Sequence, residues 1–251
     1  SHWGVYGQVM DKSGTPIGDE FLVNTYTSGN QYNPSVTSLS DGSFVVTWRD
    51  DQGQSGGRDG NSTDVFGQRF DGHGFRVGEE FLINADADSG TQDDPSVADL
   101  GNGRFVVAWR DDNGGLHDKN TGNAATGDSA DVRGQIFTTV DGVGSDLATP
   151  VEDGGDFRIN TYTSGIQSHT SVTGLKDGGF VVTWQSNNQD GSNYGIYGQR
   201  YDEYGGSVGD EFRVNTYINS IQSEPSVTSL TDGGFVVTWQ SNSQDGSNYG
   251  I

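Results

Sequence analysis

Two acidic, glycine-rich segments contain the side chains best suited to binding a metal ion. Carboxylate and amide oxygens on flexible turns are the ligands that calcium prefers, and it takes about six to eight of them. The spacing is not that of an EF-hand, so the alternative is a solvated acidic loop in which Asp and Asn residues form turns. We expect Ca2+ as a cofactor, with these ligands: Asp50, Asp51, Asp59, Asn61, Asp64, Asp111, Asp112, Asp128 and Asp131.

Aromatic and amide side chains near the C-terminus form a second candidate site. A sugar ring stacks on an aromatic side chain, and neighbouring amides can hydrogen-bond its hydroxyl groups. The alternative is that the tyrosines belong to loops and to the core. The expected ligand-binding residues are Gln185, Asn193, Tyr194, Gln240, Asn248 and Tyr249.

Catalytic chemistry has weaker support in the sequence. Glycoside hydrolysis needs two carboxylates in one cleft, one with a raised pKa, and no Asp or Glu stands out in an apolar strand-end setting. The histidines are scattered and have no metal-ligand spacing: His2, His73, His117 and His169. These observations predict that the chain is not an enzyme.

The charge of the chain limits its partners. The sequence holds 35 Asp and Glu but only 13 Lys and Arg, for a formal net charge of −22. Such a chain repels nucleic-acid backbones and anionic membrane surfaces, so we expect neither as a partner. No apolar stretch approaches the 18 residues of a membrane span, so we expect no membrane insertion.

The chain consists of four copies of one sequence repeat, whose best-matched part we call the repeated phrase. Its copies end at Trp48, Trp109, Trp184 and Trp239. A Gly-Gln pair keeps step with the phrase, and we expect its glutamines to be buried amides that bond backbone groups: Gln8, Gln68, Gln135 and Gln199. This period predicts a single repeat domain, 1–251, with units of approximately 6–64, 65–131, 132–196 and 197–251.

Each unit is expected to form four short strands and no helix. The strand Phe44–Trp48 follows an Asp-Gly turn and is apolar on both faces, which indicates burial between two sheets. Four-stranded sheets covered on both faces by copies of themselves form a β-propeller. We therefore expect an all-β, four-bladed β-propeller, in which the N-terminal strands complete the blade begun by Pro225–Trp239. The alternatives are an open β-repeat array or part of a larger propeller.

The repeated phrase also resembles a known kind of sequence. The segments Gln222–Ser241 and Gln189–Asp202 are similar to tandem repeats of large secreted bacterial RTX-type calcium-associated exoproteins and adhesins. The resemblance covers nearly the whole chain. It implies a secreted module at the bacterial cell surface, with flanking modules of a larger protein as neighbours.

Three functions are compatible with these features. The main expectation is an extracellular calcium-associated binding or adhesion module that recognises a glycan or a cell-surface polymer. The second is a structural spacer or scaffold that binds no ligand and is stabilised by calcium. The third is a polysaccharide-acting enzyme.

Overall fold

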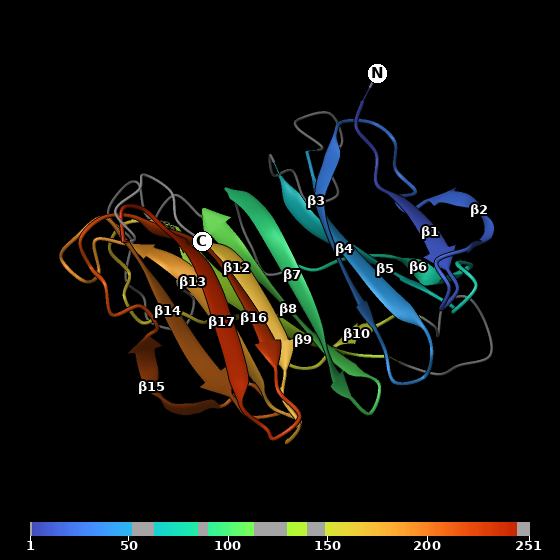
Figure 1. Cartoon of the computed structure of the whole chain (residues 1–251). Coiled ribbons are helices and arrows are strands. Elements are labelled where there is room, and N and C mark those ends of the chain that lie inside the picture. Colours follow the sequence, from blue (N-terminus) through green and yellow to red (C-terminus); the bar gives the residue numbers. More distant parts are fainter. Residues whose placement is uncertain (1, 52–62, 85–89, 113–129, 140–148, 245–251) are drawn as a thin grey trace.

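The computed structural model describes residues 2–51, 63–84, 90–112, 130–139 and 149–244, and these residues form strands and turns without a helix (Figure 1). They contain no apolar helix of membrane-spanning length. Three larger sheets lie between two hairpins. The strands are β1 (Tyr6–Met10) and β2 (Pro16–Leu22); β3 (Gln31–Ser38), β4 (Phe44–Asp50), β5 (Asp64–Phe70) and β6 (Arg76–Leu82); β7 (Thr91–Gly101), β8 (Arg104–Asp112), β9 (Asp131–Thr138), β10 (Val151–Glu152) and β11 (Phe157–Arg158); β12 (Gln167–Gly174), β13 (Phe180–Asn187), β14 (Tyr194–Tyr201) and β15 (Ser207–Arg213); β16 (Gln222–Ser229) and β17 (Phe235–Ser241).

Successive sheets meet along their first strands, β3, β7, β12 and β16, which we call the inner strands (Figure 1). One serine on an inner strand accepts a hydrogen bond from the next inner strand. The amide of Val97 donates to Ser35 Oγ (3.2 Å), and the pattern recurs from Val172 to Ser96 and from Val227 to Ser171 (both 3.1 Å). These bonds give each sheet the same offset from the next.

The core lies between the sheets, as the apolar second strand of each unit predicts. Trp48, Trp109 and Trp184 have no exposed surface. Each full sheet also stacks an aromatic ring of its second strand on one of its third, with centroids 5.0 to 5.2 Å apart. The rings fill the space between blades, where offset aromatic pairs are favourable.

The expected closure of a four-bladed ring is not seen in the described residues. The hairpin β1–β2 and the hairpin β16–β17 are separate two-stranded sheets (Figure 1). Tyr6 on β1 is therefore 65% exposed, whereas its counterpart Tyr197 is 7% exposed. A hairpin forms from local hydrogen bonds, but closure requires the rotations between sheets to sum to a full turn, and a repeat pattern does not encode that sum.

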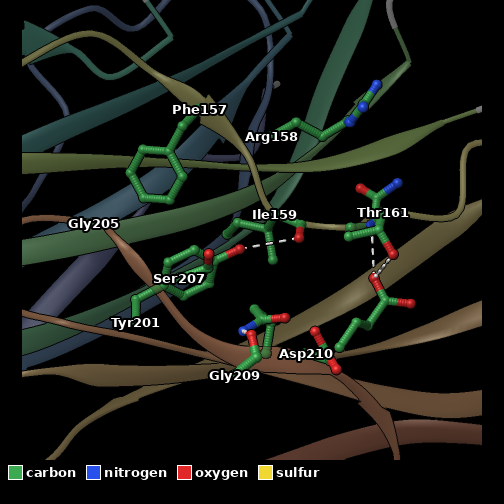
Figure 2. Close-up of a pocket in the computed structure, with 12 residues that line it drawn as sticks. Phe157, Arg158, Ile159, Thr161, Tyr201, Gly205, Ser207, Gly209 and Asp210 are labelled. Carbon is green, nitrogen blue, oxygen red and sulfur yellow. Dashed lines mark hydrogen bonds between the residues drawn. The ribbon is translucent and has the colours of Figure 1, made fainter.

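The outer strands diverge, and a cavity of about 620 Å³ opens between β11 and β15 (Figure 2). Phe157 and Tyr201 form an aromatic side of this cavity, and the acidic residues Asp210 and Glu211 also line it.

Candidate functional site

Each inner strand contains a β-bulge, and the residue at the bulge is polar but of a different type in each unit. Each strand has a buried glutamine as its first or second residue, and a register shift, the mark of a β-bulge, begins after the next residue. β-Bulges are over-represented next to active sites. The residue two after the glutamine is left-handed in every unit, although none is a glycine. These four residues, which we call the inner-strand row, are Asn33 (φ 55°), Asp94 (φ 50°), His169 (φ 55°) and Glu224 (φ 53°).

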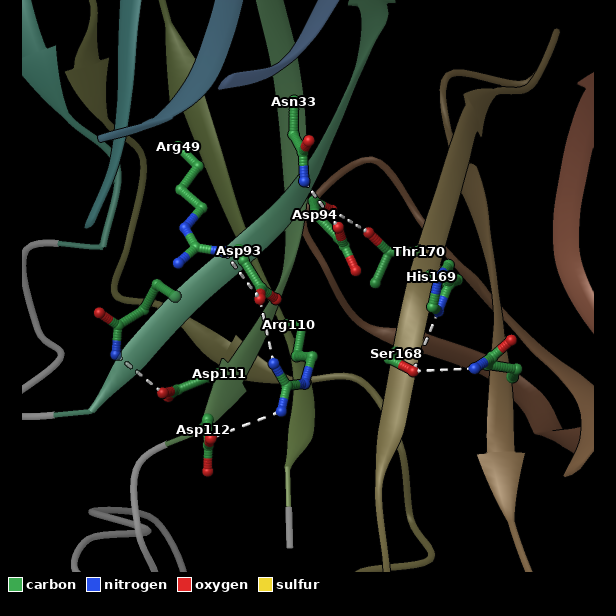
Figure 3. Close-up of polar contacts among 12 residues, drawn as sticks. Asn33, Arg49, Asp93, Asp94, Arg110, Asp111, Asp112, Ser168, His169 and Thr170 are labelled. Atoms are coloured by element: carbon green, nitrogen blue, oxygen red, sulfur yellow. Dashed lines mark hydrogen bonds and ion pairs between the residues drawn. The ribbon is translucent and has the colours of Figure 1, made fainter. Parts of the chain in front are cut away.

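Side chains of the inner-strand row bond one another across neighbouring sheets. Asn33 Nδ2 donates to Asp94 Oδ1 (3.0 Å), and His169 Nε2 lies 3.1 Å from Glu224 Oε1. The two pairs are joined by Thr170, whose hydroxyl donates to the carbonyl oxygen of Asp94 (2.7 Å; Figure 3). The row therefore brings two carboxylates, an imidazole and an amide to one end of the inner strands.

Two arginines and an aspartate lie beside the row. The carboxylate of Asp93 is 3.0 Å from Arg110 and 3.5 Å from Arg49, which follows the tryptophan of the preceding sheet (Figure 3). Burial raises the pKa of Asp93, and the two guanidinium groups oppose that shift. Arg110 also pairs with Asp112 (3.4 Å), so two carboxylates balance the two positive charges beside the row.

Four of the aspartates expected to bind calcium lie at this same end of the sheets, and each accepts a hydrogen bond from an amide side chain. Asp50 faces Asp64 across β4 and β5, and Asp111 faces Asp131 across β8 and β9. A glutamine or an asparagine donates to each one: Gln31 to Asp50 (3.3 Å), Asn84 to Asp64 (3.0 Å), Gln92 to Asp111 (3.0 Å) and Asn160 to Asp131 (2.7 Å).

Asp111 has the most perturbed surroundings of these carboxylates. Arg133 stands where the other units have Phe66 and Tyr197, and it lies 3.6 Å from Asp111. The same guanidinium makes two bonds to Asp156 (2.8 and 2.9 Å). Burial nevertheless raises the pKa of Asp111 to about 6, and the opposing contacts of Gln92 and Arg133 only reduce the shift.

The described aspartates of the expected calcium set have partners within the protein. Within the described residues, no three His, Cys, Asp or Glu side chains converge as metal ligands. Around Asp111 the positive charge is already supplied by Arg133. Asp51 accepts a bond from the Tyr32 hydroxyl (2.9 Å), and Asp112 pairs with Arg110 (3.4 Å). Asp59, Asn61 and Asp128 lie outside the described residues, so calcium binding by the loops stays a prediction.

The expected sugar-binding residues that the structure describes lie on or beside three strands, β13, β14 and β17. Gln185 is buried beside the inner-strand row, where its amide donates to Ser168 Oγ (3.1 Å; Figure 3). Asn193 and Tyr194 lie at the start of β14, and Gln240 is exposed on β17. Asn248 and Tyr249 lie outside the described residues.

Sequence reasoning missed the inner-strand row. It placed His169 among scattered histidines and did not select Asn33, Asp94 or Glu224. A usable signal was present in the sequence. In each unit the second residue after the inner-strand glutamine is polar, yet its type changes from Asn to Asp, His and Glu; these glutamines are Gln31, Gln92, Gln167 and Gln222. Such variation inside an otherwise uniform phrase marks a position that the scaffold alone does not determine.

Comparisons with protein-family models and with curated proteins gave no match. Solved structures do match. *Trypanosoma rangeli* sialidase has a TM-score of 0.56 at 12% identity, and the alignment covers 96% of this chain and 38% of that one. *Penicillium chrysogenum* α-L-arabinanase complexed with arabinobiose has a TM-score of 0.52 at 15% identity, covering 94% and 68%. A *Dyadobacter fermentans* protein of unknown function has a TM-score of 0.51 at 17% identity, covering 84% and 62%.

These matches establish the fold as all-β and of the propeller type. They also correct two expectations. The sequence analysis favoured a binding or adhesion module and excluded an enzyme, but the chain shares its fold with glycoside hydrolases. The prediction that the chain is not an enzyme rested on spacing along the sequence, and spacing does not show which residues of separate strands become neighbours.

Proposed function

We propose that this chain hydrolyses glycosidic bonds of a polysaccharide. The observation that carries the proposal is the inner-strand row, which gathers Asp94, His169 and Glu224 from three sheets of a propeller. Left-handed residues other than glycine cost roughly 1 kcal/mol or more each, and they cluster at functional sites. Solved propellers of the same fold act on or bind sugars, which supports this choice.

The row offers separate groups for the acid and the base. Asp94, whose carboxylate is oriented by the Asn33 amide (3.0 Å), takes a proton from the attacking water. Glu224 donates a proton to the leaving glycosidic oxygen as the bond from the anomeric carbon breaks. His169, 3.1 Å from Glu224, relays a proton from solvent to that carboxylate, and Asp94 releases its proton to solvent, so both carboxyl groups return to their starting states.

The substrate is proposed to be neutral. A net charge of −22 repels a polyanionic glycan from every side. The two arginines nearest the row are already engaged by Asp93, so they do not reverse this repulsion. A neutral glycan such as an arabinan avoids it, and arabinobiose is the ligand in the matched arabinanase structure.

The test is the release of reducing sugar from arabinan and a panel of neutral and acidic polysaccharides. Asp94→Asn and Glu224→Gln should each lower kcat by roughly 10²- to 10⁴-fold, the usual contribution of a general acid or base. Asp232→Asn removes the same charge from the exposed turn between β16 and β17 and should leave the rate unchanged. Absence of release by the unmodified chain, or full activity of both variants, would contradict the proposal.

Two further statements belong to this proposal. We take the chain to be part of a larger propeller or an open array rather than a closed four-bladed ring, because β1 and β17 are not paired among the described residues. A secreted location at a bacterial cell surface fits a polysaccharide substrate, and it rests on the resemblance of the repeats to those of exoproteins.

A further inference from the structure

The cavity between β11 and β15 has a counterpart between β2 and β6 that a side chain of the protein itself crosses. There, one terminal nitrogen of Arg76 donates to three successive carbonyl oxygens of the preceding sheet. The acceptors are Leu22 (2.7 Å), Val23 (3.2 Å) and Asn24 (3.4 Å). A guanidinium group thus joins these two blades at their outer strands.

The residue equivalent to Arg76 at the cavity is Ser207. Both follow a left-handed glycine by two positions, Gly74 (φ 88°) and Gly205 (φ 84°), and both begin the fourth strand of their sheet. Serine is too short to reach across, and the cavity of about 620 Å³ lies where the arginine would extend. Figure 2 shows the Arg158 side chain directed away from Ser207 and Tyr201.

The frame around the two clefts is otherwise the same. Glu80 Oε2 accepts the amide and the hydroxyl of Thr25 (both 2.7 Å), and Glu211 Oε2 accepts those of Thr161 (2.6 and 2.9 Å). One acceptor differs: the Ile159 oxygen, equivalent to that of Val23, is bonded by the Tyr201 hydroxyl (3.0 Å). The blades are therefore held at the same spacing with or without the arginine.

The walls of the cavity suit a cation with a flat apolar surface. Asp210 and Glu211 supply two negative charges against the one positive charge of Arg158 in the same lining, and the carbonyl oxygen of Asn160 occupies the place of the Asn24 acceptor. The Phe157 ring, half-buried against Tyr201, offers an aromatic face. A guanidinium group stacks on such a face and donates in its plane, which a compact ammonium group does less well.

We propose that this cavity binds the guanidinium group of an external ligand, in the way that the neighbouring cleft binds Arg76. The ligand class is a small guanidinium compound or a free arginine side chain. The site is separate from the inner-strand row and does not depend on the proposed hydrolysis.

The test counts binding sites for methylguanidinium by isothermal titration at physiological ionic strength. The unmodified protein should bind one equivalent, and neutral N-methylurea should not bind. Ser207→Arg should fill the cavity as Arg76 fills its own and should weaken binding at least tenfold. Arg76→Ser should open the second cleft and raise the stoichiometry from one to two.

A matched variant controls for attraction to the acidic surface. Ser13→Arg adds the same charge in the exposed turn between β1 and β2 and should leave binding intact. Equal weakening by Ser13→Arg and Ser207→Arg would mean that the cation binds the surface at large and would overturn the proposal. So would the absence of saturable binding to the unmodified protein, or an Arg76→Ser variant that folds but gains no site.

Discussion

Asp111 shows how one substitution changes the chemistry of a repeated position. Its counterpart in the third unit is Ser186, and Arg133 replaces the aromatic residue found in the other units. In the second unit Asp111, at 3% exposure, therefore lies beside a guanidinium group in a buried charged cluster. The surroundings determine whether such a carboxyl keeps its proton.

The raised pKa of Asp111 predicts a pH-dependent stability. The folded state holds the proton up to about pH 6, whereas an unfolded chain releases it near pH 3.8. The folded state thus binds more protons in this window, so this contribution is fully present below pH 3.8 and is lost as the pH rises through 6. Its size is on the order of 2 to 3 kcal/mol.

Asp111→Asn cannot titrate and should abolish that dependence. Denaturant unfolding between pH 4 and pH 7 should show the variant gaining stability relative to the unmodified protein as the pH rises. Asp232→Asn, in an exposed turn, serves as the control and should give a curve parallel to that of the unmodified protein. A constant difference between Asp111→Asn and the unmodified protein would show that Asp111 titrates normally.

At the scale of the strand, the two residues of the Gly-Gln pair recur for different physical reasons. Gln68 donates to the carbonyl oxygens of Arg69 (2.9 Å), Gly78 (3.3 Å) and Val77 (3.4 Å), which confirms the expected buried amide. A Cβ on Gly67 would lie 2.6 Å from the Phe81 ring, so a glycine is required there. The pair fixes the third strand against a bulged fourth strand.

Gly67→Ala should therefore destabilise the protein. The added methyl group must displace the buried ring of Phe81, and overpacking of this kind costs about 1 to 3 kcal/mol. Ser38→Ala on the exposed end of β3 should change the stability by less than about 0.5 kcal/mol. Unfolding in urea measures both, and equal stabilities of the two variants would show that the ring moves aside freely.

The sequence predicts the strands better than it predicts the site. The apolar run from Phe44 to Trp48 and the Asp-Gly turns follow local rules, and together they predict the order of strands within each unit. The inner-strand row depends on contacts such as Asn33 with Asp94, 61 residues apart. No local pattern encodes which sheets become neighbours, so the gathering of Asp94, His169 and Glu224 could not be read from spacing.

At the scale of the whole molecule, the two terminal hairpins are complementary halves of a blade. By the register of β13 with β14, Val236 on β17 would face Val9 on β1. The edges expose apolar side chains that full sheets cover: Tyr6 (65%), Met10 (50%) and Val236 (42%). Exposed strand edges with apolar side chains are templates for pairing with another chain.

This complementarity predicts head-to-tail association between copies. The chain has no cysteine, so a Val9→Cys, Val236→Cys double variant introduces the only thiols. Oxidation should yield disulfide-linked dimers and larger species on a non-reducing gel, because the two hairpins of one chain are separate. Each single variant should stay monomeric, because its cysteine would face a valine of the next copy. A cross-linked monomer would instead show that the chain closes its own ring.

The paired clefts at Arg76 and Ser207 bear on how such an array could evolve. Duplication of a unit copies its Thr-Glu clamp, so each new blade is already positioned against its neighbour. A single substitution at the first position of the fourth strand then determines whether an arginine fills the neighbouring cleft, as Arg76 does, or a serine leaves it open, as Ser207 does. Binding capacity could thus be gained or lost one blade at a time without altering the scaffold that selection preserves.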